Sequence, residues 1–264
     1  MDLRLHGKSA LVTGSTAGIG LAIAAGLAAE GAAVIVNGRS RNRVDEAIAK
    51  IRSQHPTAGI SGIDADVASS DGIQRLTQAI ADVDILVNNA GIFEARSFDK
   101  ITDADWERFF QTNVMSGVRL SRFYLPKMLA RNWGRIVFIS SESALQIPAE
   151  MIHYGMTKTA QLAVARGLAE LTAATGVTVN SVLPGPTASE GVELFVKQLA
   201  DRQGKSPDAI EKEFFQSARP SSLLKRFATS EEVANMVVYV CSPLASATNG
   251  ASLRVDGGVV RSIA

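Results

Sequence analysis

The chain has 264 residues, of which 46% are hydrophobic and 20% charged, so it can bury one large core. Its net charge of +1 and its lack of long basic runs argue against nucleic acid and anionic membranes as partners. Cys241 is the only cysteine, so an intrachain disulfide is impossible and a reducing compartment is expected. The N-terminus lacks a signal-peptide pattern, and no apolar run is long enough to cross a bilayer, which predicts a cytoplasmic protein.

The first predicted unit is a strand, a glycine-rich turn and a helix. Residues 10–13 form a short apolar run, residues 14–20 have the spacing G-x-x-x-G-x-G, and an Ala- and Leu-rich helix extends to about Glu30. Glycines let backbone N–H groups approach a ligand, and a helix N-terminus favours pyrophosphate. A plain strand-to-helix turn has the same spacing, but the position between strand and helix favours a dinucleotide site.

The second predicted strand, residues 33–37, is followed by Arg39 and by no nearby acidic residue. NAD-preferring folds place Asp or Glu here for the ribose 2′-hydroxyl, whereas the next carboxylate in this chain is Asp45, inside the following helix. Arg39 can pair with a 2′-phosphate, so the sequence favours NADP(H) over NAD(H). A solvated loop arginine is the alternative interpretation.

The alternation of strands and helices continues after a third strand near residues 59–64. Asp66 lies just beyond it, where the adenine edge of a dinucleotide would lie, and is also a candidate cap for a helix that begins near Ser70. A fourth strand over residues 83–87 ends in residues 88–91. Their small and amide side chains suit a cofactor cleft at a topological switch point.

A long helical segment is predicted next. It begins at residues 102–105, passes through Asn113 and extends to about Met128. Pro126 should kink or end it, because proline lacks the N–H that continues a helix. Asn113 is an unusual residue in the middle of a helix.

The fifth predicted strand, residues 134–140, ends at Ser141, and the next helix carries Tyr154 and Lys158. Spacing of i and i+4 places the two side chains on one helix face, roughly 6 Å apart. The ammonium then favours the phenolate and lowers the phenol pKa from about 10. Such a phenol can exchange a proton with a carbonyl or alcohol oxygen. Tyrosine–lysine pairs are also common in ordinary helices, so this interpretation needs a cofactor site and a matching hydroxyl.

Residues 188–227 interrupt the alternation after a sixth strand over residues 177–183. They predict two short amphipathic helices, the second with Ser206 as its N-cap and Pro207 at its first position. This segment is either a substrate lid or an oligomer contact. A capping box at residues 229–232 starts a further helix, and a last strand follows near residues 252–255.

Six apolar residues are candidates for a largely apolar substrate pocket, although core packing explains them equally well. They are Ile147, Met151, Ile152, Phe195, Phe214 and Phe215.

Other chemistries have little support. The chain has no G-x-S-x-G elbow, and its three histidines are scattered, so neither a serine hydrolase of that type nor a metal site is predicted. His153 precedes Tyr154, but adjacent helix positions point about 100° apart, so we expect it at the surface or the rim of the site.

The pattern as a whole predicts a single α/β domain over residues 1–264. At least six strands alternate with helices, and no repeat or linker appears. This alternation indicates a doubly wound parallel sheet with helices on both faces, and a small helical lid at about 188–227.

These motifs, in this order, resemble the short-chain dehydrogenase/reductase family over essentially the whole chain. The motifs that carry the resemblance are Thr13-Gly14-Ser15-Thr16-Ala17-Gly18-Ile19-Gly20, Asn88-Asn89-Ala90-Gly91, Asn113, Ser141 thirteen positions before Tyr154, Lys158, Pro184-Gly185 and Val255-Asp256-Gly257-Gly258. Each motif is modest alone, but the ordered set is specific. The resemblance implies a Rossmann-like, seven-stranded parallel sheet, a nicotinamide cofactor at the strand carboxyl ends, and a homotetramer or homodimer.

The resemblance also implies a catalytic set of Asn113, Ser141, Tyr154 and Lys158. Tyr154 would be the acid in reduction and the base in oxidation, while Lys158 would bind the nicotinamide ribose and lower the tyrosine pKa. Ser141 would position the substrate oxygen, and Asn113 would hold a water that links Lys158 to solvent. The implied cofactor contacts are Gly14, Ser15, Thr16 and Ile19 at the phosphates and adenosine ribose, Asp66 and Val67 at adenine, Asn88, Ala90 and Gly91 at the ribose side, and Tyr154, Lys158, Pro184, Gly185 and Thr187 at the nicotinamide end.

The sequence therefore predicts an NADP(H)-dependent oxidoreductase that transfers a hydride between nicotinamide and a small ketone or secondary alcohol. A 3-oxoacyl thioester (acyl-carrier-protein) reductase is an alternative, although no clear basic cluster marks a carrier-protein partner. A non-catalytic NADP(H)-binding regulator is an alternative of another class; such proteins usually lose the serine, tyrosine or lysine that this chain has. An epimerase or dehydratase of the longer related families is a third alternative.

Overall fold

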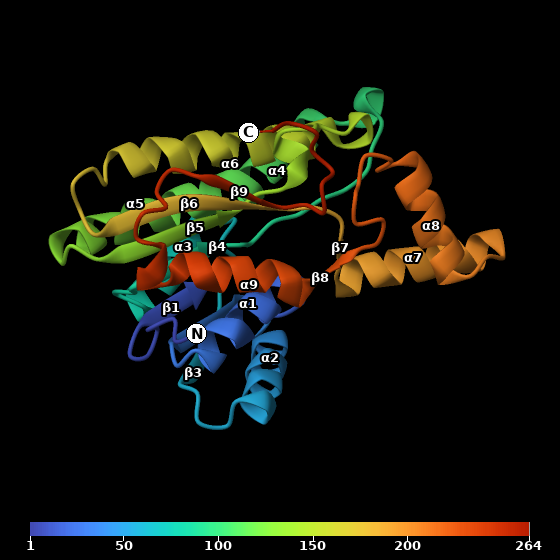
Figure 1. Cartoon of the computed structure of the whole chain (residues 1–264). Helices are drawn as coiled ribbons and strands as arrows, with labels where there is room; N and C mark the ends of the chain where they lie inside the picture. Colours follow the sequence, from blue (N-terminus) through green and yellow to red (C-terminus); the bar gives the residue numbers. More distant parts are fainter. Residues whose placement is uncertain (264) are drawn as a thin grey trace.

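A sheet of seven parallel strands forms the centre of the molecule (Figure 1). The strand order is β3-β2-β1-β4-β5-β6-β9, so the chain builds outward from β1 to one edge and then from β4 to the other. The topological switch point of the sheet therefore lies between β1 and β4. The computed structural model describes residues 1–263, apart from the side chains of residues 193–195 and 198. The strands are β1 (Ser9–Val12), β2 (Ala33–Gly38), β3 (Ile60–Asp64), β4 (Ile85–Asn88), β5 (Gly134–Ile139), β6 (Val177–Pro184) and β9 (Ser252–Val255).

Helices cover both faces of the sheet, which confirms the predicted Rossmann-like, doubly wound fold (Figure 1). One face carries α1 (Gly18–Ala29), α2 (Arg41–Gln54) and α9 (Ser230–Cys241). The opposite face carries α3 (Ser70–Ala79), α4 (Asp103–Phe110), α5 (Ser116–Ala130) and α6 (Ile152–Glu170).

Each face of the sheet has its own hydrophobic core. Along β1, Ala10 and Val12 belong to the core under α1 and α9, whereas Leu11 belongs to the core under α5 and α6. This alternation arises because successive side chains of a strand point to opposite faces. Strands that are buried on both faces carry apolar residues in unbroken runs, and this is why the strands were recognisable in the sequence.

The long helical segment is confirmed, but Pro126 does not end it. Helices α4 and α5 are joined by a π-helical turn, Gln111–Met115, that contains Asn113. Pro126 lies inside α5, which continues to Ala130. Proline removes the backbone bond to the carbonyl of Arg122, and both residues lie on the exposed side of α5, where water can satisfy that carbonyl.

Residues 188–227, which we call the lid, project beyond the carboxyl end of the sheet as α7 (Glu190–Gln203) and α8 (Pro207–Ser217) (Figure 1). Ser206 caps α8 as predicted. The lid is joined at its base by a parallel pair, β7 (Thr187–Ala188) with β8 (Ala228–Thr229). Two-residue strands carry no detectable periodicity, so the sequence did not predict this pair.

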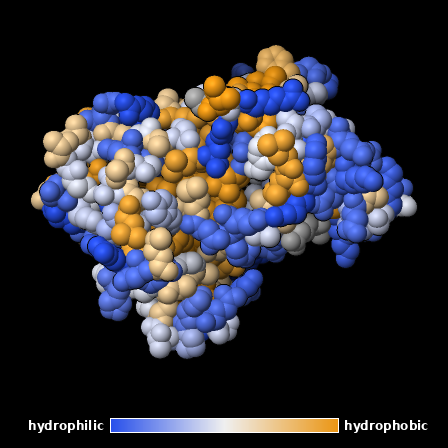
Figure 2. Space-filling view, in the orientation of Figure 1, coloured by the Kyte–Doolittle hydropathy of each residue, from blue (hydrophilic) through white to orange (hydrophobic). Residues whose placement is uncertain are grey.

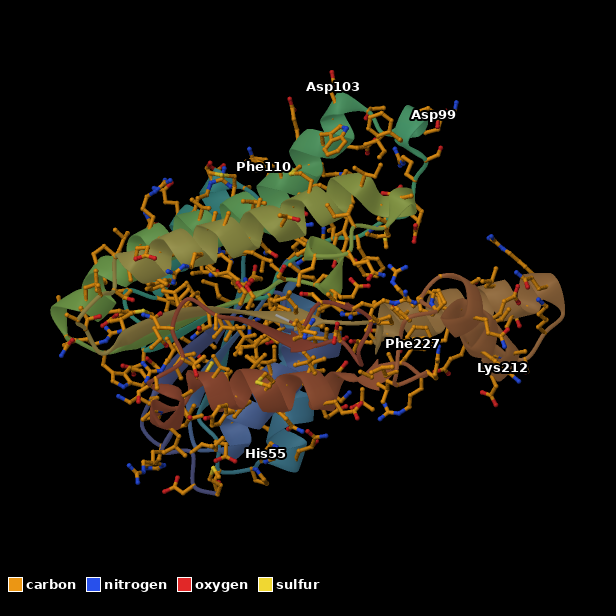
Figure 3. All side chains as sticks on the ribbon, turned by 45° about the horizontal axis from the view of Figure 1, so that its top comes forward. His55, Asp99, Asp103, Phe110, Lys212 and Phe227 are labelled. Atoms are coloured by element: carbon orange, nitrogen blue, oxygen red, sulfur yellow. The ribbon has the colours of Figure 1, made fainter. Side chains whose placement is uncertain are left out.

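A cluster of three aromatic rings holds the lid together internally. The ring centroids of Phe214, Phe215 and Phe227 lie 5.1 to 5.2 Å apart. Phe227 lies at the end of the lid that faces the sheet, and Lys212 points outward from α8 (Figure 3). The lid thus has a small apolar centre of its own.

We predict that Phe138→Ala in β5 lowers the free energy of unfolding by about 3–5 kcal/mol, because a lost ring leaves a cavity in a packed core. Phe138 is fully buried in the core under α5, whereas Phe98 is 64% exposed. Chemical denaturation of both alanine variants measures the difference, with Phe98→Ala as the matched control expected within about 0.5 kcal/mol of the parent. Equal losses in the two variants would contradict this description of the core.

Candidate active site

A cavity of about 1070 Å³ lies at the carboxyl ends of the strands, between the sheet and the lid. Figure 2 shows hydrophobic surface gathered in a hollow beside the hydrophilic outer side of the lid. Open α/β sheets bind their ligands at this edge, near the topological switch point. The cavity is therefore the candidate active site.

The cavity brings together many of the predicted site residues and leaves others out. Those in its wall are Ile19, Gly91, Ser141, Tyr154, Lys158, Pro184, Gly185 and Thr187. In the part of the chain that the structure describes, the predicted residues outside the wall are Gly14, Ser15, Thr16, Arg39, Asp66, Val67, Asn88, Ala90 and Asn113.

The turn between β1 and α1 fits a pyrophosphate. Gly14 and Gly18 have positive φ angles of 61° and 54°. A Cβ atom on Gly20 would lie 2.4 Å from Nδ2 of Asn89, so only glycine fits there. Ala17 at the N-cap of α1 makes no capping side-chain bond, so the first N–H groups of this helix remain available to an anion.

Ser15 shapes this turn from the inside. Its hydroxyl is buried, donates to the carbonyl of Val12 at 2.7 Å and accepts from the backbone N–H of Asn37 at 3.0 Å. The side chain predicted to contact phosphate is thus engaged with the strands β1 and β2.

The two asparagines at the carboxyl end of β4, Asn88 and Asn89, make different contacts. Asn88, predicted as a cofactor contact, directs its amide to the hydroxyl of Ser121 in α5 at 3.2 Å. Asn89 lines the cavity instead, and its amide donates to the carbonyls of Thr13 and Gly14 at 2.8 and 3.0 Å. The sequence motif contains both asparagines but does not show which of them faces the sheet edge.

Two of the three positions predicted near the 2′-phosphate and adenine, Arg39 and Asp66, lie at the surface, whereas Val67 is buried. Arg39 is exposed and makes no hydrogen bond or ion pair among residues 1–263. Asp66 is also exposed and accepts from the N–H of Ala68 at 3.1 Å. It does not cap α3, because Ser69 takes that role by accepting from the N–H of Gly72.

Tyr154 and Lys158 line the cavity from the first turns of α6. The Nζ atom of Lys158 lies 5.6 Å from the centroid of the tyrosine ring. It donates to the carbonyl of Ile139 at 2.9 Å and to Oε1 of Gln161 at 3.1 Å. The ammonium is therefore bonded to the end of β5 and to its own helix rather than to the phenol.

The expected lowering of the tyrosine pKa is not found. Burial raises the pKa of Tyr154 to about 12; a hydrogen bond with Ser141 and the charge of Arg219 act against this, and the charge of Glu142 acts with it. Burial also lowers the pKa of Lys158 to about 7. Desolvation has the largest effect on both groups, and the ammonium donates to Ile139 and Gln161 rather than to the phenol.

Of the two adjacent serines, only Ser141 has its hydroxyl near the tyrosine. The hydroxyl of Ser140 donates to the carbonyl of Lys158 at 2.8 Å and is used within the scaffold. The hydroxyl of Ser141 donates to Oε2 of Glu142 at 3.0 Å and accepts from the N–H of Ser143 at 3.1 Å. This geometry agrees with the choice of Ser141 by its spacing to Tyr154.

A buried ion pair links the serine loop to the lid. Nε of Arg219 donates to Oε1 of Glu142 at 2.9 Å, and the two side chains are only 9% and 4% exposed. Both residues line the cavity. A buried charge is costly unless it is paired, so this pair fixes the lid end against the loop after β5. Neither residue was identified from the sequence, since they lie 77 positions apart and belong to no recognised motif.

Asn113 is fully buried and supports the cavity from behind. Its Oδ1 accepts from the N–H of Ile92 at 2.8 Å, while its Nδ2 donates to the Ile92 carbonyl and to the Thr157 hydroxyl, each at 3.0 Å. Its own main-chain carbonyl accepts from Nε2 of Gln161 at 2.7 Å. The side chain thus joins the loop after β4 to α6.

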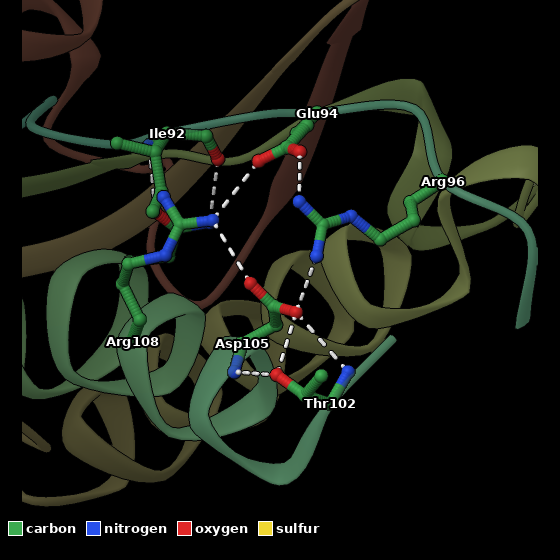
Figure 4. Close-up of polar contacts among 7 residues, drawn as sticks. Ile92, Glu94, Arg96, Thr102, Asp105 and Arg108 are labelled. Carbon is green, nitrogen blue, oxygen red and sulfur yellow. Dashed lines mark hydrogen bonds and ion pairs between the residues drawn. The ribbon is translucent and has the colours of Figure 1, made fainter. Parts of the chain in front are cut away.

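Four charged residues tie the same loop to α4 (Figure 4). Arg96 donates to Oδ2 of Asp105 at 2.6 Å, and Arg108 donates to Oε2 of Glu94 at 2.9 Å and to Oδ1 of Asp105 at 3.3 Å. We call Glu94, Arg96, Asp105 and Arg108 the loop cluster. It holds the segment that places Phe93 beside the ring of Tyr154, at 6.4 Å between centroids.

His153 is buried, so the prediction of a surface position is wrong. Its ring packs against Phe109 at 4.1 Å and Trp106 at 6.0 Å between centroids. Helix α4 covers this side of α6, and a single helix pattern does not show that a second helix packs there. Burial lowers the pKa of His153 and disfavours its charged form.

The apolar pocket prediction is confirmed for some residues. Met151 and Phe214 line the cavity, Phe215 is buried within the lid, and Ile147 is half exposed. Ile152 does not line the cavity among the residues that the structure describes. The side chain of Phe195 lies outside the described residues.

Neither a cluster of potential metal ligands nor a membrane-spanning helix is present in residues 1–263. No cluster of three His, Cys, Asp or Glu residues with metal-binding geometry occurs in that range. Within the same range, every helix is too short or too polar to cross a bilayer.

The chain resembles known proteins over its whole length. The family model described as short chain dehydrogenase matches residues 8–199. The uncharacterized oxidoreductase YvaG of Bacillus subtilis is 49% identical over 263 residues, with 100% of both chains covered. The 3-oxoacyl-[acyl-carrier-protein] reductase FabG of Aquifex aeolicus is 33% identical, with 98% of this chain and 100% of its own covered. L-sorbose reductase from Gluconobacter frateurii, solved with NADPH and L-sorbose, superposes with a TM-score of 0.93 at 31% identity and covers 100% of both chains.

The loop cluster predicts a stability that depends on pH. Hydrogen bonds from Thr102 and then from Arg108, with the charge of Arg96, lower the pKa of Asp105 from 3.8 to about 2. A carboxyl with a lowered pKa stabilises the fold above its unfolded pKa, and this contribution is lost as the pH falls from about 4 to about 2. We therefore expect wild-type stability to fall more steeply over this window than that of Asp105→Asn, as measured by urea unfolding at a series of pH values.

Asp103→Asn is the matched control for this experiment, because Asp103 is exposed in the same helical turn. It should follow the wild-type pH dependence. The same dependence in Asp105→Asn would show that the loop cluster does not hold this carboxylate in its charged form.

Proposed function

The chain belongs to the short-chain dehydrogenase/reductase family, and from this premise we propose that it reduces a ketone with NADPH or oxidises the matching secondary alcohol with NADP⁺. Enzymes of this family are oxidoreductases that act on CH–OH groups. The observation that carries the proposal is the meeting of Ser141, Tyr154 and Lys158 in one cavity at the switch point of the sheet.

We propose that Tyr154 is the acid–base group. When bound, the nicotinamide supplies or accepts the hydride at the carbon of the substrate. In reduction, the phenol of Tyr154 gives its proton to the carbonyl oxygen, and in oxidation the phenolate takes the proton of the alcohol. A raised pKa keeps the phenol protonated at neutral pH, which suits reduction.

Ser141 and Lys158 have supporting roles in this proposal. The hydroxyl of Ser141 hydrogen-bonds the substrate oxygen and orients it toward the phenol. The ammonium of Lys158 stabilises the phenolate that forms and binds the hydroxyls of the nicotinamide ribose. Gly185 and Thr187, at the end of β6, would meet the nicotinamide amide; the Thr187 hydroxyl already donates to the Gly185 carbonyl at 2.9 Å.

We propose NADP(H) rather than NAD(H) as the cofactor. Arg39 follows β2, is exposed, and has no acidic partner among the described residues, so it is available to a 2′-phosphate. L-sorbose reductase, which shares the fold over its whole length, was solved with NADPH. Gly14, Ser15, Thr16 and Ile19 would lie near the phosphates, and Asp66 and Val67 near adenine.

The substrate that we propose is a small carbonyl compound enclosed by the lid. Support comes from the mostly apolar wall around Met151 and Phe214 and from the buried ion pair of Glu142 with Arg219. A 3-oxoacyl thioester is the second candidate, because the 3-oxoacyl-[acyl-carrier-protein] reductase of Aquifex aeolicus is 33% identical. The complete set of serine, tyrosine and lysine argues against a non-catalytic regulator.

We further propose a cytoplasmic homotetramer or homodimer that associates through the long helices α5 and α6. Exposed apolar side chains near these helices, Phe110 at the end of α4 and Leu171 at the C-cap of α6, support such an association.

The assay of this function is oxidation of NADPH or NADH against a panel of ketones, ketoses, diketones, aldehydes and 3-oxoacyl thioesters. We predict turnover with NADPH and a loss of about 10²–10⁴-fold in kcat for Tyr154→Phe, because the proton donor is removed. Binding of NADPH, followed by its fluorescence, should stay close to that of the parent. Near-normal turnover in Tyr154→Phe would exclude the proposed mechanism, and tight NADPH binding without turnover on any substrate would favour the regulator.

The cofactor preference has its own test. Arg39→Ala is expected to weaken NADPH binding about tenfold or more while NADH binding changes little, because only NADPH carries the 2′-phosphate that a charged hydrogen bond would hold. Titration calorimetry with both cofactors measures the effect. Arg122→Ala, at an exposed arginine of α5, is the control that should leave both affinities unchanged. Equal losses for the two cofactors in Arg39→Ala would remove the proposed role.

A further inference from the structure

Gln161 is a buried polar residue of α6 that the proposed mechanism has not used. It is 1% exposed and lies three positions after Lys158, so the two side chains share one face of the helix. Its Oε1 accepts from Nζ of Lys158 at 3.1 Å, and its Nε2 donates to the main-chain carbonyl of Asn113 at 2.7 Å. One amide thus joins the catalytic lysine to the π-helical turn between α4 and α5.

The orientation of this amide is determined by its partners. The ammonium of Lys158 can only donate, and the carbonyl of Asn113 can only accept, so the oxygen must face the lysine and the nitrogen the turn. A buried amide without partners is costly, and here both ends have one. Residues 111–115 also form a π-helical turn, a rare conformation that is concentrated at functional sites.

The ammonium has few other partners. It carries three N–H groups, of which one donates to the Ile139 carbonyl and one to Gln161. This leaves one N–H for a ligand in the cavity. Gly91 lies beside both groups, since a Cβ atom there would be at ordinary contact distance from Oδ1 of Asn113, 3.4 Å, and from Nζ of Lys158, 3.5 Å.

Charged and titratable groups of the cavity wall come from several elements. Tyr154 itself is on the same helix, Glu142 comes from the loop after β5, and Arg219 comes from the lid. Burial is the only influence resolved on the ionisation of Lys158. The position and charge of the ammonium therefore depend on its neutral acceptors, and Gln161 supplies one of the two.

We propose that Gln161 is a positioning residue for the hydride transfer, whose side-chain amide holds the Lys158 ammonium in place by joining it to the Asn113 carbonyl. This inference rests on the proposed function for its catalytic consequence. The family resemblance implied that Asn113 holds a water that links Lys158 to solvent; in this structure the Gln161 side chain joins Lys158 to the Asn113 carbonyl. The amide couples the lysine to the π-helical turn and, through Asn113, to the loop after β4.

The proposal predicts opposite effects for two substitutions of similar size. Gln161→Leu removes an acceptor from the ammonium, so the protonated form of Lys158 is less favoured and its titration midpoint should fall by about one pH unit. Gln161→Glu places a carboxylate beside the ammonium, so the midpoint should rise. A side chain that only fills space would lower stability in both variants without moving the midpoint in opposite directions.

The direct measurement is NMR titration of the full chain labelled with ¹³C and ¹⁵N at lysine, with Lys158→Arg identifying the signal. Lys158 is expected to titrate near 7, apart from exposed lysines. Gln146→Leu, the same change at an exposed glutamine near the active site, is the matched control and should reproduce the parent curve. Unchanged midpoints in both Gln161 variants would overturn the proposal.

The catalytic consequence is tested by the pH profile of kcat/KM for reduction with NADPH. The pH at which kcat/KM falls on the alkaline side should be lower in Gln161→Leu and higher in Gln161→Glu. Above the parent midpoint, Gln161→Leu should be about tenfold less active than the parent. The two proposals fail differently. If no substrate is turned over, the proposed function fails, and the NMR midpoints still decide the role of Gln161. If turnover occurs but neither the pH profiles nor the midpoints move, only the role of Gln161 is wrong.

Discussion

The site depends on keeping a positive charge inside the protein. Lys158 is only 5% exposed at the end of β5, where burial disfavours its charged form, so the ammonium must be solvated by protein dipoles. The Ile139 carbonyl and the Gln161 amide provide this solvation, and the π-helical turn supplies the carbonyl that orients the amide. Asn113, in that same turn, holds the loop after β4. The arrangement of β4, β5 and α6 around the cavity thus follows from a single electrostatic requirement.

The two sides of the cavity are held in different ways. The side formed by the loop after β4 is fixed to Asn113 and to the loop cluster on α4, and it packs on the body of the fold. The lid side is connected to the body by the β7–β8 pair at its base, by the Arg219–Glu142 ion pair, and by backbone hydrogen bonds from Leu223 and Leu224 to the Gly257 carbonyl. Glu142 also accepts from the Ser141 hydroxyl, so the lid and Ser141 share one carboxylate. A change in the position of the lid would therefore alter the hydrogen bond between Glu142 and the Ser141 hydroxyl.

The sequence predicted the elements that depend on local patterns and missed those that depend on tertiary contacts. Apolar runs and caps predicted the positions of the strands and helices. The spacing of Ser141, Tyr154 and Lys158 predicted a shared site, and the three residues line one cavity. The burial of His153 depends on the packing of α4 against α6, which no single-helix pattern contains. Contacts between distant segments also determine that Asn89, and not Asn88, lines the cavity. The same is true of the pairing of Glu142 with Arg219. Pro126 was misjudged because its tolerance depends on which side of α5 faces solvent.

The short β7–β8 pair has a consequence for how this fold diversifies. Hydrogen bonding between the two strands brings the ends of a forty-residue excursion together, independently of what lies between them. Because lengthening an already closed loop costs little entropy, the intervening segment can be exchanged or extended as a cassette while β6 and α9 keep their register. Evolution can therefore vary the shape of the cavity beneath the lid while the strand ends and α6 stay in place. The β7–β8 pair marks the two boundaries of the segment that can be exchanged.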